Sequence, residues 1–442
     1  MTARTAPSSP GAPSAPSAPT GTSGPRRRVA ARAALCAAVL LAPALLAPAW
    51  PAAADSPAPS APELPALAQT LPDVRENGCR KPSTRAADRT PWAQVYLHPE
   101  AAWPFGRGAG VTVAVLGSGV EAAAGTGSGA LAGRLRLGPR LHGQGDAGRD
   151  CVGHGTFLAA LVAGRRTPDG GPAGIAPEAT VLAVAVTDDA GTTTPDLLAQ
   201  GIRAAADGGA RVAVVGVPVP APNQPLAEAV EYAAAKGVLL VAPAAADGQQ
   251  EKGAVYPAGF PGVLAVAAVG PGGSAAGGSA SGDAGTGAQA AAGARVDLAA
   301  PGEALQAAGP GGGHFTSSGP SGAAALVAGV AALVLSREPA LTAAQVAERL
   351  RSTAYRPGTT LPDPAVGWGT VDVVAATAAL PAPQSTGGPG NAAGPVTVPP
   401  APDGTSVTRA SALAGASAGL VAVVALTAAA VRSGRRRAGG AR

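Results

Sequence analysis

The stretch VTVAVLG, residues 111–117, is continuously apolar and rich in valine. Strands that are covered on both faces have this composition, whereas half-exposed strands alternate apolar and polar residues. Four further runs share it: TVLAVAV (180–186), RVAVVGV (211–217), GVLLVAP (237–243) and GVLAVAAV (262–269). The sequence therefore predicts a largely parallel sheet covered on both faces.

Helical patterns lie between and after these strands, as βαβ connections require. They fall in residues 194–209, 225–237 and 341–354. Thr194 and Pro195 are suited to the cap and first turn of the first helix, and Thr342 and Gln345 form a capping box in the last. We expect an α/β fold whose ligands bind beyond the carboxyl ends of the strands.

Composition and charge argue against a nucleic-acid-binding protein. The chain has 442 residues, 46% of them apolar, which is enough for a sizeable core. Its formal charge is +5, but ten of its 32 lysines and arginines lie before residue 33 or after residue 431. The remaining 22 are outnumbered by 27 acidic residues, so the body of the chain is acidic and presents no basic face.

Both ends of the chain have the pattern of membrane-targeting segments. Residues 1–54 comprise a leader and a signal peptide, with basic residues, an apolar run and a small-residue cleavage site after Ala54; the alternative is an anchor that stays uncleaved. Residues 410–431 are long and apolar enough to span a bilayer, and the basic residues 432–442 follow at once. This predicts a single-pass type I protein of the cell membrane, with an extracytoplasmic body and a cytoplasmic tail.

One folded domain is expected between two linkers. Residues 55–71 form a Pro/Ala-rich linker, and residues 381–409 form a Pro/Gly-rich stalk without a core-forming pattern. The domain between them spans residues 72–380.

The cysteines favour a disulfide. Removal of a signal peptide takes Cys36 away and leaves Cys79 and Cys151. In an oxidising compartment a disulfide between these two is favoured over a reactive thiol or a metal pair. Zinc lacks enough ligands, so the sequence predicts no metal site and no cofactor.

Two residues at predicted helix starts carry side chains suited to catalysis. His154 lies between two glycines in CVGHGT, and Ser321 opens the longest apolar helical run, after Gly319 and Pro320. Each alone has a structural explanation, as a buried histidine or as a helix-capping serine. Together they follow an order that is found in one clan of serine proteases.

The sequence resembles the subtilisin-like serine proteases, and within them the mycosins, which are membrane-anchored proteases associated with type VII secretion in actinobacteria. The resemblance covers residues 79–380. The segments that show the resemblance are GAGVTVAVLGSGV, DCVGHGTFLAALVAGR, AGIAPEATVLAVAV, YPAGFPGVLAVAAVG, VDLAAPG and GPSGAAALVAGVAALV. It implies a subtilisin-like three-layer fold with a mostly parallel central sheet, a polypeptide substrate or ligand, and membrane components of type VII secretion as partners.

Half of the catalytic set that the resemblance implies is missing. His154 matches the residue that accepts the proton, and Ser321 matches the nucleophile. Gly117 stands in place of the orienting aspartate, and Ala246 in place of the asparagine that donates to the oxyanion. In subtilisin, losing that aspartate lowers turnover about 3 × 10⁴-fold and losing that asparagine about 10²- to 10³-fold. These two positions predict a degenerate site.

Further features bear on substrate binding and on a replacement acid. Pro218 and Pro220 stand where the family has a strand that pairs with the substrate backbone, and proline has no N–H to donate. Glu121 and Asp150 are the acids to consider as replacements, and either would have to reach the far nitrogen of the imidazole.

Three functions follow from these observations. The first is an impaired or inactive protease homologue that serves type VII secretion by binding. The second is an active serine endopeptidase of narrow specificity that uses His154 and Ser321. The third is a cell-surface binding module, for which the stalk and anchor suffice.

Overall fold

The computed structural model describes residues 63–127, 129–166, 171–248, 254–271, 294–358 and 360–379. The predicted signal (1–54), stalk (381–409), membrane span (410–431) and tail (432–442) lie outside these residues, as do residues 55–62 of the predicted linker. The fold below concerns the unit that begins at Leu64.

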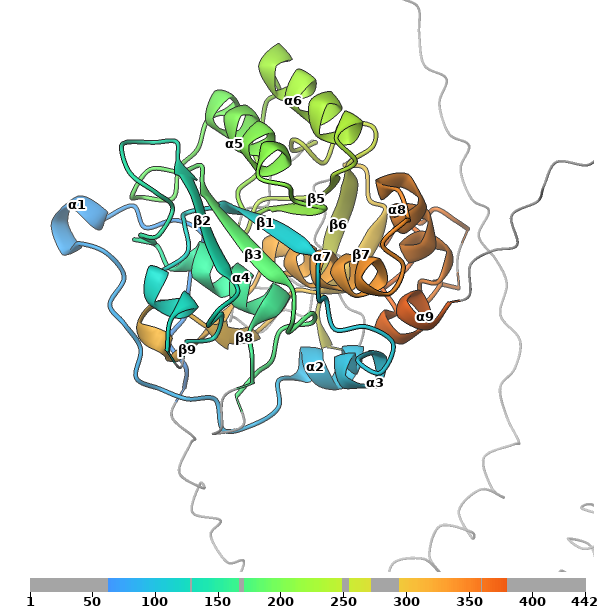
Figure 1. Cartoon of the computed structure of the whole chain (residues 1–442), viewed down its shortest axis with the longest axis horizontal. Coiled ribbons are helices and arrows are strands. Elements are labelled where there is room, and N and C mark those ends of the chain that lie inside the picture. The colour runs from blue at the N-terminus through green and yellow to red at the C-terminus, as the bar shows by residue number, and fades with distance from the viewer. Residues whose placement is uncertain are drawn as a thin grey trace, which may run out of the picture. The chain divides into compact units, whose positions relative to one another are not determined.

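A seven-stranded parallel sheet forms the centre of the fold, in the order β2-β3-β1-β4-β5-β6-β7 (Figure 1). The strands are β1 (Thr112–Gly117), β2 (Leu135–Arg140), β3 (Thr180–Ala185), β4 (Val212–Val215), β5 (Leu239–Pro243), β6 (Leu264–Val269) and β7 (Leu298–Pro301). The five predicted strands are all present. In β1, β3, β4, β5 and β6 every residue is buried except the first residue of β1 and of β3, as continuous apolar runs require.

Helices cover both faces of the sheet, so the predicted three-layer α/β fold is confirmed. The α-helices of the described residues are α1 (Val74–Asn77), α2 (Trp92–Leu97), α3 (Pro99–Ala102), α4 (His154–Ala163), α5 (Pro195–Asp207), α6 (Gln224–Ala235), α7 (Pro320–Arg337), α8 (Ala343–Ser352) and α9 (Val373–Ala378). Helices α4 and α7 share one apolar core with the sheet, and α5 and α6 share another on the opposite face (Figure 1).

The ends of two helices follow from their capping residues. The Thr194 side chain accepts a hydrogen bond from Leu197 N, and Pro195 fills the first position of α5. Thr342 and Gln345 form both halves of a capping box at α8. These local signals place α5 and α8 where the sequence predicts them.

Helix α7 is the central helix of the core. Among the helices of the described residues it is the one long and apolar enough to cross a membrane, and 89% of it is buried. Its glycines allow close contact with neighbouring segments: a Cβ on Gly329 would lie 2.7 Å from the side chain of Ile175, in the segment before β3. The helix therefore belongs to the domain core, and it fixes the position of Ser321 near its N-terminus.

Two elements outside the main sheet adjoin the carboxyl edge. Strands β8 (Leu305–Ala308) and β9 (His314–Ser317) form an antiparallel hairpin that leads directly into α7. Residues 64–71, at the end of the predicted linker, contact β9 and the loops after β3 and β4.

Candidate active site

His154 and Ser321 lie side by side at the carboxyl edge of the sheet. His154 is the first residue of α4 and Ser321 the second of α7, and both helices begin at this edge. His154 Nε2 is 3.1 Å from Ser321 Oγ, within hydrogen-bonding distance. Each residue is only 1% exposed. This is the contact that lets a histidine accept the proton of a serine nucleophile.

The other nitrogen of the imidazole has no partner. Within the described part of the chain, His154 Nδ1 is buried and makes no hydrogen bond. Gly117 ends β1 beside α4, and a Cβ added there would have a single neighbour within 4 Å, Gly155 Cα at 3.7 Å. A Cβ therefore fits at Gly117 without a clash, but among the described residues no group contacts His154 Nδ1 to fix its tautomer.

Neither acid considered as a replacement takes that role. Asp150 accepts hydrogen bonds from the backbone N–H of Gly153 and Thr156, both at 2.7 Å, and thereby caps the start of α4. Glu121 accepts a hydrogen bond from Gly311 N at 2.8 Å. Both carboxylates hold loops around the site and leave His154 Nδ1 without a partner.

Asp247, which the sequence arguments did not single out, is the acid that enters the site. Its Oδ1 accepts a hydrogen bond from Ser321 N at 2.9 Å, and its Oδ2 accepts one from Ser321 Oγ and lies 3.3 Å from His154 Nε2. Its side chain is 6% exposed. The sequence does contain a sign of this role. Asp247 directly follows Ala246, after the carboxyl end of β5, and this is the edge of the sheet where the other site residues lie.

Gly319 makes room for this carboxylate. A Cβ at Gly319 would overlap the Asp247 carboxyl group, and the φ angle of Gly319 is 156°. The backbone N–H of a serine nucleophile is a donor to the oxyanion in this type of chemistry. The Asp247 carboxylate therefore occupies the Ser321 N–H, which would otherwise donate to the negative charge that develops on the carbonyl oxygen.

The segment after β4 offers few donors to a peptide. Pro218 and Pro220 have no N–H, as the sequence indicates. Val219 exchanges two backbone hydrogen bonds with Tyr256, at 2.9 and 2.8 Å, so its N–H is already used.

Cys79 and Cys151 form a disulfide, with Cα atoms 4.6 Å apart. Arg80 N also donates to Cys151 O at 2.8 Å. The covalent bond joins the N-terminal segment to the loop before α4, at a residue three positions before His154. Within the described ranges, no group of three or more His, Cys, Asp or Glu residues is arranged to hold a metal ion.

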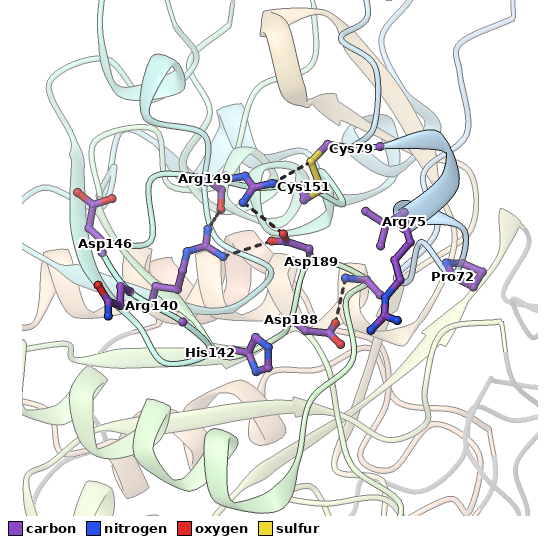
Figure 2. A pocket seen from close by; sticks show the side chains of 16 residues that line it. Pro72, Arg75, Cys79, Arg140, His142, Asp146, Arg149, Cys151, Asp188 and Asp189 are labelled. Atoms are coloured by element: carbon purple, nitrogen blue, oxygen red, sulfur yellow. Dashed lines mark hydrogen bonds and ion pairs between the residues drawn. A yellow bond between two sulfur atoms is a disulfide. The ribbon is translucent and has the colours of Figure 1, made fainter.

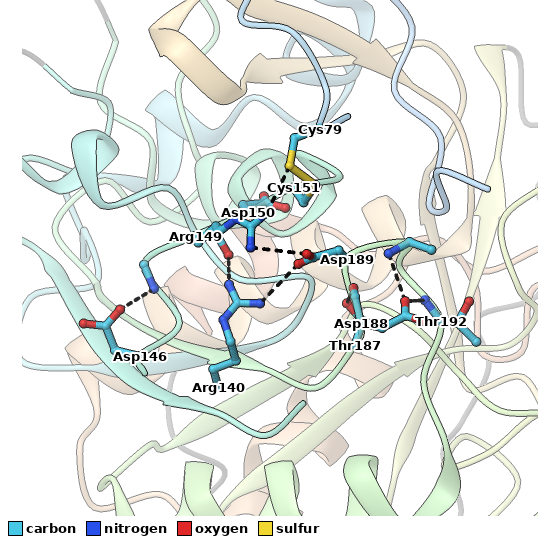
Figure 3. Close-up of polar contacts among 12 residues, drawn as sticks. Cys79, Arg140, Asp146, Arg149, Asp150, Cys151, Thr187, Asp188, Asp189 and Thr192 are labelled. Carbon is cyan, nitrogen blue, oxygen red and sulfur yellow. Dashed lines mark hydrogen bonds and ion pairs between the residues drawn. A yellow bond between two sulfur atoms is a disulfide. The ribbon is translucent and has the colours of Figure 1, made fainter. Parts of the chain in front are cut away.

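A polar cavity of about 800 Å³ lies between this disulfide and the loops after β2 and β3 (Figure 2). Asp189 pairs with Arg149 at 3.2 Å and with Arg140 at 3.7 Å. The Asp188 carboxylate accepts hydrogen bonds from Ala190 N and Thr192 N (Figure 3). These carboxylates are engaged with groups of the chain itself, so the cavity walls are held by internal contacts.

A parallel α/β sheet that brings a helix-borne histidine and serine together at its carboxyl edge defines a serine-protease-like class of fold. The model of the subtilase family (Peptidase_S8) matches residues 108–369. The chain therefore belongs to the subtilase family, and within it to the mycosin type.

Three relatives show the range of the similarity. M-protease of Shouchella clausii is 32% identical over 63% of this chain and 68% of its own length. Mycosin-1 of Mycolicibacterium smegmatis is 33% identical over 67% of this chain and 74% of its own length. The structure of MycP1, described as a serine protease and an essential component of the type VII (ESX-1) secretion system, is 30% identical, with a TM-score of 0.55 over 71% of this chain and 99% of that chain.

Proposed function

We propose that this chain is a membrane-anchored, extracytoplasmic mycosin homologue that is impaired or inactive as a protease and that serves a type VII secretion apparatus by binding. The observation that carries the proposal is the position of the Asp247 carboxylate. Asp247 contacts Ser321 N and His154 Nε2, whereas His154 Nδ1 is unpaired within the described residues.

The chemistry of acyl transfer explains why this position is unfavourable. The Ser321 hydroxyl would lose its proton to His154 Nε2 while Oγ attacks the carbonyl carbon, and the carbonyl oxygen would become an anion. The imidazolium then needs a negative partner at Nδ1, and the oxyanion needs hydrogen-bond donors. Asp247 lies beside His154 Nε2 and not beside Nδ1, and its negative charge would repel the oxyanion. The imidazolium therefore has no partner at Nδ1 among the described residues, and the oxyanion meets an anion in place of a donor.

The link to secretion rests on relatives. MycP1 is described as an essential component of the type VII (ESX-1) secretion system. The anchoring proposal rests on the apolar residues 410–431 and the basic residues 432–442 that follow them. A cell-surface module unrelated to secretion is distinguished by co-purification: recovery of this protein with secretion-membrane proteins argues against it.

One observation supports the second candidate, an active endopeptidase of narrow specificity. The distance of 3.1 Å between His154 Nε2 and Ser321 Oγ is that of a nucleophile and its base, and it would serve catalysis once the Ser321 hydroxyl turned its proton from Asp247 Oδ2 to His154 Nε2. The two candidates differ in whether Ser321 becomes acylated.

A fluorophosphonate probe, applied to the full-length protein in detergent, separates them. We expect no labelling above that of the Ser321→Ala variant, and no hydrolysis of a mixed peptide library. Rapid labelling and peptide cleavage that both disappear in Ser321→Ala would overturn the proposal of an impaired protease and establish an active endopeptidase.

A further inference from the structure

Exposed apolar side chains gather on one surface of the domain. Five large apolar side chains are exposed in the part of the chain that the structure describes, and four of them lie around helices α2, α3 and α9. These four are Val95, Tyr96, Phe105 and Tyr355, with exposures of 54%, 41%, 44% and 59%. Aromatic residues make up only 3% of the chain, so composition alone does not account for the gathering. We refer to these four residues as the aromatic face.

Helix α3 lies at the centre of the aromatic face. Val95 and Tyr96 belong to α2, which α3 follows after one residue. Phe105 comes directly after α3, and its backbone N–H donates to Ala102 O at 2.9 Å. Helix α3 in turn packs against α9 (Figure 1). The face is therefore built from segments that contact one another.

Tyr355 joins the aromatic face through the start of α9. Its hydroxyl forms a hydrogen bond with Asp372, the N-cap residue of α9, and this bond is the largest cause of the raised pKa of Tyr355. Tyr96 contributes to the same shift, so the two tyrosines are close enough to interact. The two phenol rings thus belong to one surface.

The aromatic face and the candidate active site lie at opposite ends of α7. Arg337 is the last residue of α7, and its guanidinium lies 5.3 Å from the centroid of the Phe105 ring. Arg337 also donates to Thr377 O, in α9, at 2.9 Å. Helix α7 extends about 24 Å from Ser321 to Arg337. The aromatic face is therefore a surface distinct from the site.

The chain leaves the described domain beside the aromatic face. Helix α9 ends at Ala378, the residue after Thr377, and the predicted membrane span begins at residue 410. A flexible chain of about 30 residues has a root-mean-square end-to-end distance of about 30 Å. A bilayer that holds residues 410–431 is therefore within reach of this face.

The side chains of the face suit a membrane interface. Tyrosine and tryptophan are enriched at the level of the lipid headgroups, because each combines an apolar ring with a polar group. The half-buried Trp92 packs edge-on against Tyr96, with ring centroids 6.1 Å apart. Arg337 places a positive charge beside Phe105, and its partner Thr377 O is neutral. A guanidinium in this position can bind a lipid phosphate.

We propose that the aromatic face rests on the bilayer surface, with its rings among the headgroups and Arg337 near their phosphates. The inference rests on the proposed anchoring by residues 410–431 and adds an orientation of the domain to it. The contact is shallow, and the tether maintains it, because tethering gives the face an effective concentration at the membrane on the order of millimolar. A domain freed by cleavage of the stalk then dissociates.

The test is the quenching of a fluorophore at position 95 by brominated acyl chains. The full-length protein carries Val95→Cys for labelling with bimane, and Cys36→Ala removes the one native cysteine outside the disulfide. It is reconstituted in phosphatidylcholine vesicles that contain brominated phosphatidylcholine. The reference is the same label on Glu231→Cys, an exposed position of α6 on the other side of the sheet. We expect quenching at least about threefold stronger at position 95.

Two further variants of the Val95→Cys protein show whether the aromatic face causes the quenching. Tyr96→Ser with Phe105→Ser should lower it to the level of position 231. Leu137→Ser is the matched control, since Leu137 is the fifth exposed apolar residue and lies in edge strand β2; it should leave the quenching unchanged. If the double variant does not fold, Phe105→Ser alone carries the test.

Alkaline carbonate extraction of the same vesicles separates this inference from the proposed anchoring. Equal quenching at positions 95 and 231 in protein that resists extraction would overturn this inference alone and would indicate a protein partner for the face. Extraction of the protein would overturn the anchoring, and this inference with it. Quenching at position 95 that persists in the double variant would assign the contact to the label and contradict the proposal.

Discussion

The Asp247 carboxylate accepts a hydrogen bond from the backbone N–H of Ser321 at 2.9 Å, so an anion of the chain itself holds a donor that the chemistry of peptide hydrolysis needs. Its second oxygen engages the Ser321 hydroxyl and lies near His154 Nε2. A single substitution at Asp247 should therefore change the charge next to Ser321 and His154.

Asp247→Asn should raise the rate of fluorophosphonate labelling at Ser321 by about 10- to 100-fold. The substitution removes the negative charge and adds an N–H₂ group that can donate to an oxyanion. Asp247→Ala, which removes the charge without adding a donor, is the matched control and should gain less. Labelling rates that stay at the Ser321→Ala background for both variants would show that Asp247 is not what limits acylation.

Gly117→Asp alone should fail to restore full activity. A Cβ at position 117 meets no clash, and the new carboxylate would supply a partner for His154 Nδ1, which has none among the described residues. The oxyanion requirement stays unmet, because Ala246 has no side-chain donor and Asp247 remains charged. Combining Gly117→Asp with Asp247→Asn should exceed either single variant in peptide hydrolysis. Full family-level turnover from Gly117→Asp by itself would refute this account.

Removing the Cys79–Cys151 disulfide should destabilise the domain. The two cysteines are 72 positions apart in the sequence, and closing a loop of this length is worth roughly 4 kcal/mol in the chain-entropy model. Urea unfolding of Cys79→Ser/Cys151→Ser against the oxidised parent measures the difference. A midpoint equal to that of the parent would contradict the prediction.

The Glu338–Arg349 pair should give the domain an acid-sensitive contribution to stability. Arg349 donates to both Glu338 oxygens, at 2.6 and 3.0 Å, and this lowers the pKa of the Glu338 carboxyl below its usual value of 4.5. A lowered folded-state pKa stabilises the protein above the unfolded-state value, and this stability is lost as the pH falls through the folded-state pKa. Glu338→Gln should lose about 1 kcal/mol at neutral pH. The difference from the parent should vanish at low pH, which urea titrations at several pH values would reveal.

Protease treatment of intact cells should release the folded body through the segment 381–408. The expectation follows from the stalk composition and from the arginine cluster directly after residues 410–431. An immunoblot for the domain in the supernatant reports the result. A body that stays protected in intact cells and becomes sensitive only after lysis would reverse the topology.

The sequence predicts the sheet well because its strands are signalled locally. VTVAVLG and the four similar runs are apolar throughout, so their burial on both faces needs no tertiary information. The five runs do not include two strands of the sheet. Strand β2 (LRLGPR) is a partly exposed edge strand that lacks the apolar pattern, and strand β7 (LAAP) is a run of only four residues. The capping residues Thr194 and Thr342 are equally local, and they define the helix starts correctly.

The site is only partly readable from sequence. His154 and Ser321 stand at predicted helix starts, and the missing acid at Gly117 follows from the resemblance to the family. Asp247 was not identified, because its role depends on how the loop after β5 turns toward Gly319. The position of residues 64–71 depends on hydrogen bonds to residues more than 100 positions away, such as Gln69 to Gly216, and a Pro/Ala-rich composition carries no sign of them.

The bond between Cys79 and Cys151 also determines what proteolytic nicking would produce. Hydrolysis of any single peptide bond between residues 80 and 150 divides the backbone into two chains, which the sulfur bridge still joins. The shorter chain, which keeps residues 64–71, therefore stays attached to the domain after the cut. Such a two-chain form runs as one species on a non-reducing gel and separates only when a reductant is added.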